Sequence, residues 1–128
     1  MGMQQIVVYN NIPPQWTAAR DLLAARGISL ELRMIDGELS APDDQPPEAW
    51  KELRFGVPGG MVTVRRGDDR YVIVAWGNAD AALRHAWNAV TWGFAAAGHG
   101  DVLTELGRMT LADFQARAEL PPAMQSLF

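Results

Sequence analysis

Residues 6–34 constrain the fold more than any other stretch of this chain. Residues 6–9 (IVVY) are four β-formers in a row between polar residues, which is the pattern of a buried strand. Residues 16–26 carry apolar side chains at helical spacing after two prolines, and Gly27 follows them as a helix C-cap does. Residues 28–34 alternate between apolar and polar, which predicts a strand with one buried face. Strand, helix and strand within about thirty residues predict a βαβ unit with parallel strands and a right-handed crossover.

The middle of the chain predicts a connecting helix and then two paired strands. Residues 47–55 suit a short helix, because they place a proline at its first position and a glutamate in its first turn. Residues 61–65 (MVTVR) and 71–76 (YVIVAW) are rich in β-formers and flank a Gly-Asp loop. That pattern predicts an antiparallel hairpin.

A long helix and a helical tail are expected after the hairpin. Asn78 can cap the long helix, an apolar stripe runs along it, and residues 98–100 (GHG) end it. Residues 101–109 suit a short helix, and Thr110 opens a capping-box pattern for another. Three residues of the long helix lie off its stripe: His85, Asn88 and Trp92. Another part of the chain is expected to cover the tryptophan.

The resulting order of elements is βαβ, a connecting helix, ββ and a long helix. This is the thioredoxin-like arrangement, an α/β fold in which a central four-stranded mixed sheet carries helices on both faces. A short helical C-terminal extension completes it. At 128 residues the chain fits a single domain, residues 1–128, with a core at residues 1–98 and a helical tail at residues 99–128.

The absence of cysteine is the sharpest fact in the composition. It removes disulfides, a thiolate nucleophile, CxxC redox chemistry and zinc–thiolate sites together, so the chain is expected to be redox-inactive. The net charge is −4, and ten arginines are scattered among acidic residues without a basic run, so no nucleic-acid partner is expected. No apolar segment approaches the length of a membrane span, and residues 1–5 lack a signal-peptide pattern. The sequence therefore predicts a cytoplasmic protein with no membrane partner.

Part of the chain resembles the N-terminal domain of glutathione transferases. The resemblance consists of residues 7–9 (VVY), followed at similar spacing by residues 18–24 (AARDLLA) and Gly27, and it covers roughly residues 5–90. Asn78 stands where this family usually introduces its next helix with a serine. The arrangement is also similar to a glutaredoxin without its cysteines.

The resemblance makes Tyr9 the candidate catalytic residue. In the tyrosine-type transferases, a tyrosine at the end of the first strand precedes a similar helix. A phenol in that place can donate a hydrogen bond to a bound thiolate and so lower the pKa of the thiol. Glutathione is the cofactor that this role implies, and no other cofactor is expected. The alternative is an aromatic side chain at a strand end whose hydroxyl reaches solvent.

Six further residues are candidates for ligand binding: Trp16, Val57, Pro58, Trp76, Asn78 and Asp80. The Val57–Pro58 turn resembles the cis-proline turn that transferases share with glutaredoxins, whose backbone pairs with an extended peptide; an ordinary trans turn is the alternative. The start of the long helix offers free N–H groups to a carboxylate, although Asp80 also suits an ordinary helix start. The two tryptophans can line an aromatic groove or pack at the sheet edge.

Other residues depart from the family's pattern or give no metal signature. Trp76 and Gly77 stand where a transferase contacts the γ-glutamyl carboxylate, and residues 13–16 (PPQW) stand where a glutaredoxin carries Cys-Pro-x-Cys. His85 and His99 lack nearby ligand partners apart from one aspartate, so no metal site is expected.

We therefore expect a redox-inactive protein of thioredoxin fold that works by binding. It would hold a small ligand or a partner protein in one pocket at the edge formed by Tyr9, Trp16, Pro58 and Asn78. The alternative is a glutathione-dependent, transferase-like enzyme in which Tyr9 activates the thiol and a homodimer partner helps to complete the pocket. A third reading is a regulator that contacts a larger complex through its acidic surface.

Overall fold

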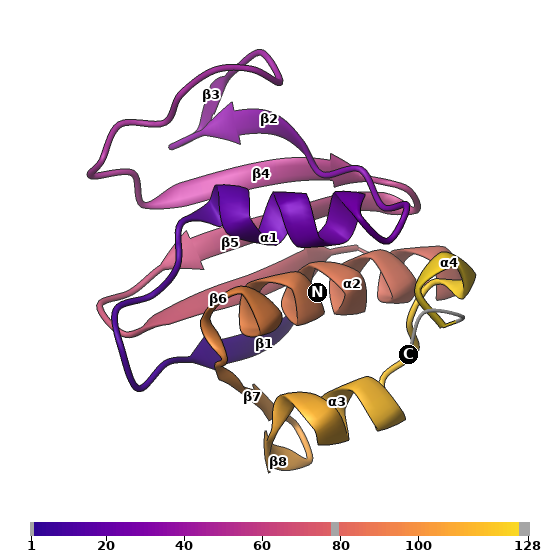
Figure 1. Ribbon diagram of the computed structural model, residues 1–128. Coiled ribbons are helices and arrows are strands. Elements are labelled where there is room, and N and C mark those ends of the chain that lie inside the picture. Colours follow the sequence, from indigo (N-terminus) through magenta and orange to yellow (C-terminus); the bar gives the residue numbers. More distant parts are fainter. Residues whose placement is uncertain (1, 78–79, 126–128) are drawn as a thin grey trace.

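The computed structural model describes residues 2–77 and 80–125 and contains one large antiparallel sheet (Figure 1). In chain order the strands are β1 (Gly2–Val8), β2 (Glu31–Ile35), β3 (Glu38–Leu39), β4 (Glu52–Val57), β5 (Gly60–Arg66), β6 (Arg70–Trp76), β7 (Asp101–Thr104) and β8 (Gly107–Met109). The helices are α1 (Trp16–Ala24), α2 (Ala81–Gly98), α3 (Leu111–Arg117) and α4 (Pro122–Gln125). Across the sheet the strand order is β3-β2-β4-β5-β6-β1-β7-β8.

This topology shows that the predicted thioredoxin-like fold class is wrong. The sheet has eight strands instead of four, and all neighbouring strands are antiparallel instead of mixed. β1 and β2 do run in the same direction, because four antiparallel pairings connect them, but β6, β5 and β4 lie between them. The sequence pattern thus predicted the relative direction of β1 and β2 correctly, but it did not predict which strands pair with them. The reason is that β4, β5 and β6 pair through short local turns and fill the space between β1 and β2.

Two segments with helical predictions are strands. Residues 52–55 belong to β4, in which every second side chain is buried, so strand periodicity outweighs the helix-start signals that precede it. Residues 101–109 form the β7–β8 hairpin, and β7 pairs with β1. The helical-tail prediction for residues 99–128 is therefore correct only for α3 and α4, because the first part of this segment extends the sheet.

The long helix is confirmed, with a different cap. The N-cap of α2 is Asp80, whose carboxylate accepts a hydrogen bond from the backbone N–H of Leu83 at 2.8 Å. The predicted cap, Asn78, lies outside the described residues. α2 ends at Gly98, and His99 follows in the left-handed conformation with φ of 54°. Neither α2 nor any other described helix combines the length and the apolar content that a membrane span requires.

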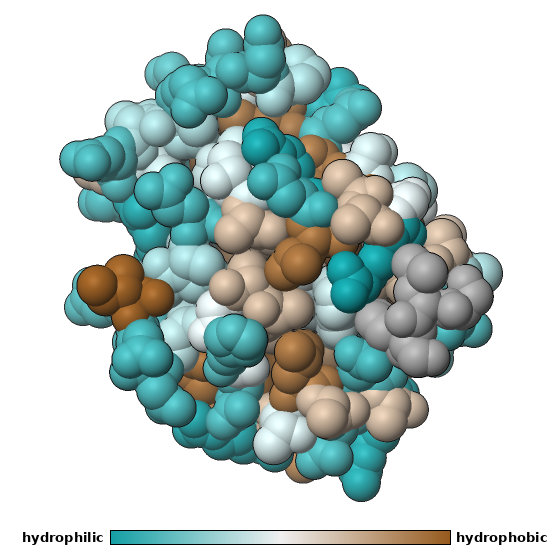
Figure 2. Space-filling view, viewed as in Figure 1, coloured by the Kyte–Doolittle hydropathy of each residue, from teal (hydrophilic) through white to brown (hydrophobic). Residues whose placement is uncertain are grey.

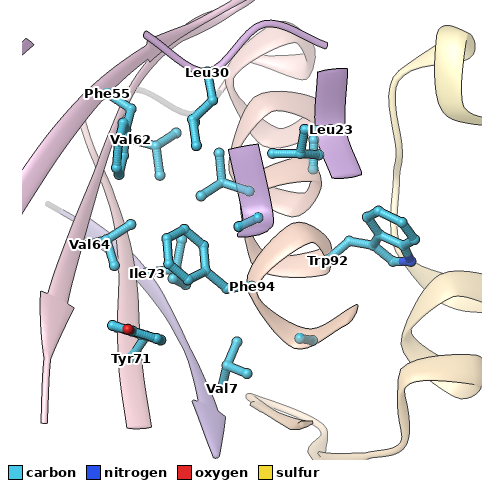
Figure 3. Close-up of a cluster of buried hydrophobic side chains, with 14 of the residues drawn as sticks. Val7, Leu23, Leu30, Phe55, Val62, Val64, Tyr71, Ile73, Trp92 and Phe94 are labelled. Carbon is cyan, nitrogen blue, oxygen red and sulfur yellow. The ribbon is translucent and has the colours of Figure 1, made fainter. Parts of the chain in front are cut away.

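The C-terminal helix α3 is capped as its sequence predicts, and it covers part of α2. The side chain of Thr110 accepts a hydrogen bond from the backbone N–H of Asp113 at 3.2 Å. Trp92 points from α2 toward the C-terminal segment, away from the main core (Figure 3), and its indole N–H donates to Gln115 at 3.1 Å. α3 therefore supplies the cover that an off-stripe tryptophan requires.

The hydrophobic core lies between the sheet and helices α1 and α2 (Figure 3). Four large side chains in it are completely inaccessible to solvent: Leu23, Phe55, Ile73 and Phe94. The two helices approach closely because Gly93 of α2 faces Leu23 of α1. A Cβ atom at Gly93 would lie 2.9 Å from the Cδ1 atom of Leu23, so this glycine makes room for the leucine.

The described helices cover only one face of the sheet (Figure 1), so the prediction of helices on both faces is wrong. On the other face, Thr63 and Val74 are 1% and 2% exposed. Long side chains screen them; for example, Arg54 Nε donates to Thr63 Oγ1 at 3.3 Å. Trp76 remains half exposed there. β2 and β4 alternate apolar with more polar residues, and such a pattern requires a packed layer on one face only.

Candidate functional site

The predicted site residues do not come together in the structure. β6 is antiparallel to β1, whose last residue pairs with Arg70 and whose first residue pairs with Trp76. Tyr9 directly follows β1 and so lies at the Arg70 end, whereas Pro58, between β4 and β5, lies at the Trp76 end. β6 has seven residues, and a rise of about 3.3 Å per residue places its two ends about 20 Å apart. The predicted single pocket shared by Tyr9 and Pro58 is therefore wrong.

Tyr9 occupies a closed position at its end of the sheet. Its side chain is 6% exposed, and its hydroxyl donates a hydrogen bond to the carbonyl oxygen of Phe94 at 2.6 Å. Burial raises the pKa of the Tyr9 phenol far above its usual value, and the neighbouring Tyr71 raises it further. The hydroxyl proton is held by the carbonyl of Phe94 and Tyr9 lines none of the cavities described here, so the phenol is not placed to stabilise a bound thiolate. The glutathione-dependent alternative loses its activating group.

A hollow of about 370 Å³ lies at the other end, and two of the predicted residues, Trp76 and Asp80, line it. The peptide bond before Pro58 is trans, so the cis geometry implied by the resemblance is wrong. Val57 is buried and pairs with Gly60, which commits its backbone to the sheet. The Asp80 carboxylate already caps α2. This hollow therefore brings two predicted residues together, and the carboxylate of one of them is already used by the helix.

Trp16 lines a separate cavity of about 470 Å³, between the loops that precede α1 and β4. Its ring is 7% exposed, which agrees with the packing alternative for this tryptophan. Two of the polar side chains around the cavity are engaged with backbone carbonyls. The Tyr71 hydroxyl donates to the carbonyl of Pro14 at 2.5 Å, and the guanidinium of Arg66 donates to the carbonyl of Glu48.

A further cavity, of about 430 Å³, lies between β1, α2, the β7–β8 turn and α3, and we call it the α2–α3 cleft. Figure 2 views the molecule from the helix-covered side, where apolar residues in brown and tan show between hydrophilic residues in teal. The walls of the cleft combine apolar and polar side chains, among them Met3, Gln5, Trp87, Asn88, Phe114 and Arg117. This mixture is typical of sites that hold small molecules.

Three buried polar residues, Gln5, Asn88 and Thr91, form an amide network beside the cleft. Two backbone carbonyls determine which group donates and which accepts in each hydrogen bond of the network, because a carbonyl oxygen only accepts. The Thr91 hydroxyl donates to the carbonyl of Trp87 at 2.9 Å, so Thr91 Oγ1 must accept from Gln5 Nε2 at 3.0 Å. Asn88 Nδ2 donates to the carbonyl of Glu119 at 3.1 Å, which leaves Asn88 Oδ1 to accept from Gln5 Nε2 at 3.1 Å.

The amide network leaves one acceptor unused, the Oε1 atom of Gln5. Both N–H groups of this side chain are donated, and Oε1 receives no hydrogen bond from any described residue. The atom does not belong to the fully buried polar atoms that lack a partner, so it is not sealed in the interior. Gln5 is only 5% exposed and lines the cleft, so Oε1 opens into the cleft. It is a hydrogen-bond acceptor ready for a ligand.

Charged side chains surround the opening of the cleft. Arg84 on α2 forms an ion pair with Glu119, with a distance of 3.1 Å between Nε and Oε2. Glu105 in the β7–β8 turn and Arg117 on α3 also line the cleft, and both are exposed. Neither forms an ion pair with another described residue. The rim therefore offers one anionic and one cationic group to a ligand.

Sequence reasoning missed this cleft, although two residues signalled it. Gln5 is a polar residue at an inward-facing position of a β-rich run, two residues before the buried Val7. A polar group in such a position needs a hydrogen-bond partner. Asn88 lies off the apolar stripe of α2 and is nevertheless 7% exposed. Together they indicated a buried polar contact, but not that a cavity adjoins it.

The histidines do not take part in a metal site. Among the described residues, no group of three or more histidine, cysteine, aspartate or glutamate side chains is placed to hold a metal ion. His85 and His99 lie at opposite parts of α2, one in its first half and one just after its end.

Comparisons of the chain with protein-family models, with curated proteins and with solved structures found no match in any of the three. The fold and the site define a class by themselves: a two-layer α+β protein with one helix-covered face and a cleft of ligand size beside α3.

Proposed function

We propose that this protein is a binding protein that holds a small molecule in the α2–α3 cleft. The observation that carries the proposal is the unused Gln5 Oε1 acceptor, which opens into a cavity of about 430 Å³. An accessible acceptor inside a cavity can take a hydrogen bond from a ligand group in place of solvent. The volume lies within the range of ligand pockets, about 300–1,000 Å³.

The chemistry of the cleft favours binding over catalysis. Nucleophilic catalysis by a hydroxyl requires that the hydroxyl can pass its proton to an adjacent base. Thr104 lines the cleft, but its hydroxyl donates to the carbonyl of Gly107 at 3.2 Å. The Thr91 hydroxyl of the amide network donates to the carbonyl of Trp87. Both protons are held by backbone carbonyls, which do not act as bases.

The walls of the cleft are held in place by hydrogen bonds between α2 and its neighbours. The Trp87 indole N–H donates to the carbonyl of Ile73 at 2.9 Å, which fixes the ring against the sheet. Asn88 and Arg84 both bind Glu119, which follows α3. A cleft with fixed walls binds a ligand without a large ordering cost.

The proposal is tested by nuclear magnetic resonance on nitrogen-15-labelled protein with a library of small fragments. Fragments that occupy the cleft should shift the side-chain amide signals of Gln5 and Asn88. The amide signals of Gln15 and Gln45, which line the cavity next to Trp16, are internal controls and should not move. The proposal is overturned if no fragment shifts the first pair, or if every bound fragment shifts the second pair instead.

A further inference from the structure

The floor, the walls and the rim of the α2–α3 cleft each restrict the chemistry of its ligand. At the floor, Gln5 Oε1 has free lone pairs and no free donor beside it on the same amide. A ligand group that meets this atom must therefore be an N–H or O–H donor. An ether, carbonyl or carboxylate oxygen at the inner end would face another acceptor, and is disfavoured.

The walls favour an aromatic ring. Trp87 and Phe114 both line the cleft. The indole N–H of Trp87 is already donated to the sheet, so the part of Trp87 that remains for the ligand is its apolar ring. Phe114 is only 2% exposed, so it backs this wall from the core and leaves the ring of Trp87 as the main aromatic surface. Aromatic surfaces of this kind favour a flat ring in stacked or edge-to-face contact.

The rim favours a ligand with both a positive and a negative charge. Arg84 and Glu119 neutralise each other. The remaining pair, Arg117 and Glu105, belongs to two different elements and is not joined in an ion pair. Arginine binds a carboxylate through charge-assisted hydrogen bonds, and glutamate binds an ammonium group in the same way. A multiply charged anion such as a phosphate ester would meet two glutamates at this rim.

We propose that the α2–α3 cleft binds a free aromatic α-amino acid whose ring carries a hydrogen-bond donor, the chemistry of tyrosine and tryptophan. The ligand ring packs against the ring of Trp87, its O–H or N–H donates to Gln5 Oε1, and the carboxylate and ammonium groups bind Arg117 and Glu105. This assignment rests on the proposed function, because it names the ligand class of the same cleft.

The experiment is isothermal titration calorimetry with amino acids that differ by one group. L-tyrosine should bind at least about tenfold more tightly than L-phenylalanine, because a site built around a hydroxyl rejects the analogue that lacks it. L-tryptophan should bind at least about tenfold more tightly than L-tryptophanamide, which lacks the carboxylate, and than N-acetyl-L-tryptophan, which lacks the ammonium group.

Two variants connect each preference to its residue. Arg117→Gln should remove the preference for L-tryptophan over L-tryptophanamide and keep the preference over N-acetyl-L-tryptophan. Glu105→Gln should do the reverse. Arg108→Gln and Glu31→Gln are the matched controls, because both residues are exposed and lie outside the cleft, and both preferences should survive in them.

The outcomes separate this assignment from the proposed function. If fragments shift the Gln5 and Asn88 signals but the amino acids do not bind, or bind as well as their truncated analogues, the amino-acid assignment is overturned and the binding function stands. If neither fragments nor amino acids reach the cleft, both are overturned. Preferences that appear and respond to the two variants as described support both.

Discussion

Tyr9 and Gln5 are two buried polar residues on the helix-facing side of the first strand segment. They differ in whether a hydrogen-bonding atom of the side chain remains without a partner. Tyr9 is 6% exposed and Gln5 is 5% exposed. The Tyr9 hydroxyl donates its hydrogen bond to the carbonyl of Phe94, and the Tyr9 ring packs edge-on against the ring of Tyr71. Gln5 donates two hydrogen bonds and still has an acceptor that opens into a cleft. The comparison teaches that unused bonding capacity at an accessible surface, and not residue type, marks the candidate site.

The packing around the two residues explains the difference. At the Tyr9 end, α2 ends in a glycine that lets the tyrosine ring sit against the helix. A Cβ atom at Gly98 would lie 2.6 Å from Tyr9 Cε1 and 2.7 Å from Pro14 Cδ, so no space is left for a ligand. At the Gln5 end, β1, α2, the β7–β8 turn and α3 surround the cleft and leave it open.

The largest expected effect tests the core that supports both ends. Leu23→Ala should lower the free energy of unfolding by about 2–5 kcal/mol, because the leucine is inaccessible to solvent and packs against α2. Chemical denaturation measures the loss. Leu22→Ala, at a partly buried neighbour on α1, is the control and should cost less. A loss under about half a kilocalorie for Leu23→Ala would contradict the packing of α1 on α2.

The next largest effect is expected at Gln5 and tests the amide network beside the cleft. Gln5→Leu should cost about 1–3 kcal/mol of unfolding free energy, because the acceptors Asn88 Oδ1 and Thr91 Oγ1 lose their donor. Gln4→Leu, on the same strand at an exposed position, should change the stability by less than about 0.5 kcal/mol. Equal effects of the two substitutions in urea denaturation would mean that the amide network is not formed.

A smaller effect is expected at Tyr9 and tests the hydrogen bond of its buried hydroxyl. Tyr9→Phe removes only the hydroxyl and its hydrogen bond to Phe94, so the free energy of unfolding should fall by about 0.5–1.5 kcal/mol. Ligand binding in the cleft should not change, since Tyr9 does not line it. Denaturation and calorimetry on the same protein measure the two quantities. A loss of ligand affinity without a loss of stability would contradict this and would mean that Tyr9 takes part in ligand binding.

The smallest effect appears at alkaline pH. Because burial raises the pKa of folded Tyr9 above the value of about 10 for an unfolded chain, the stability from this group is complete below pH 10 and is lost as the pH rises. The loss due to Tyr9 should reach about 0.8 kcal/mol at pH 10.5. The pKa of Tyr71 is also raised by burial, so Tyr71 adds a loss of the same sign. Tyr9→Phe should therefore reduce the pH dependence between pH 9 and 10.5 without abolishing it; an unchanged slope would contradict the buried state of this phenol.

The local elements of the fold could be predicted because their signals lie close together in the sequence. The apolar spacing of α1, the β-rich runs of the β5–β6 hairpin and the Thr110 cap are each contained within a few residues. The connecting helix was wrong because a proline and a glutamate suggested a helix start, while the alternation in β4 was the stronger pattern. The helix predicted at residues 101–109 failed because a segment of this length is too short for its period to be decisive.

The sequence by itself determined the presence and approximate extent of α1, α2 and α3 and of the β5–β6 hairpin, and that a chain without cysteine has no thiol chemistry. Tertiary structure alone decided which strands are neighbours and which polar group remains unused. Strand neighbours are set by pairing across the sheet, and the period of a strand is the same whatever strand lies beside it. Gln5 meets Asn88 across 83 positions of the chain. No local pattern contains the information that its amide N–H groups are satisfied there while its carbonyl oxygen faces a cleft.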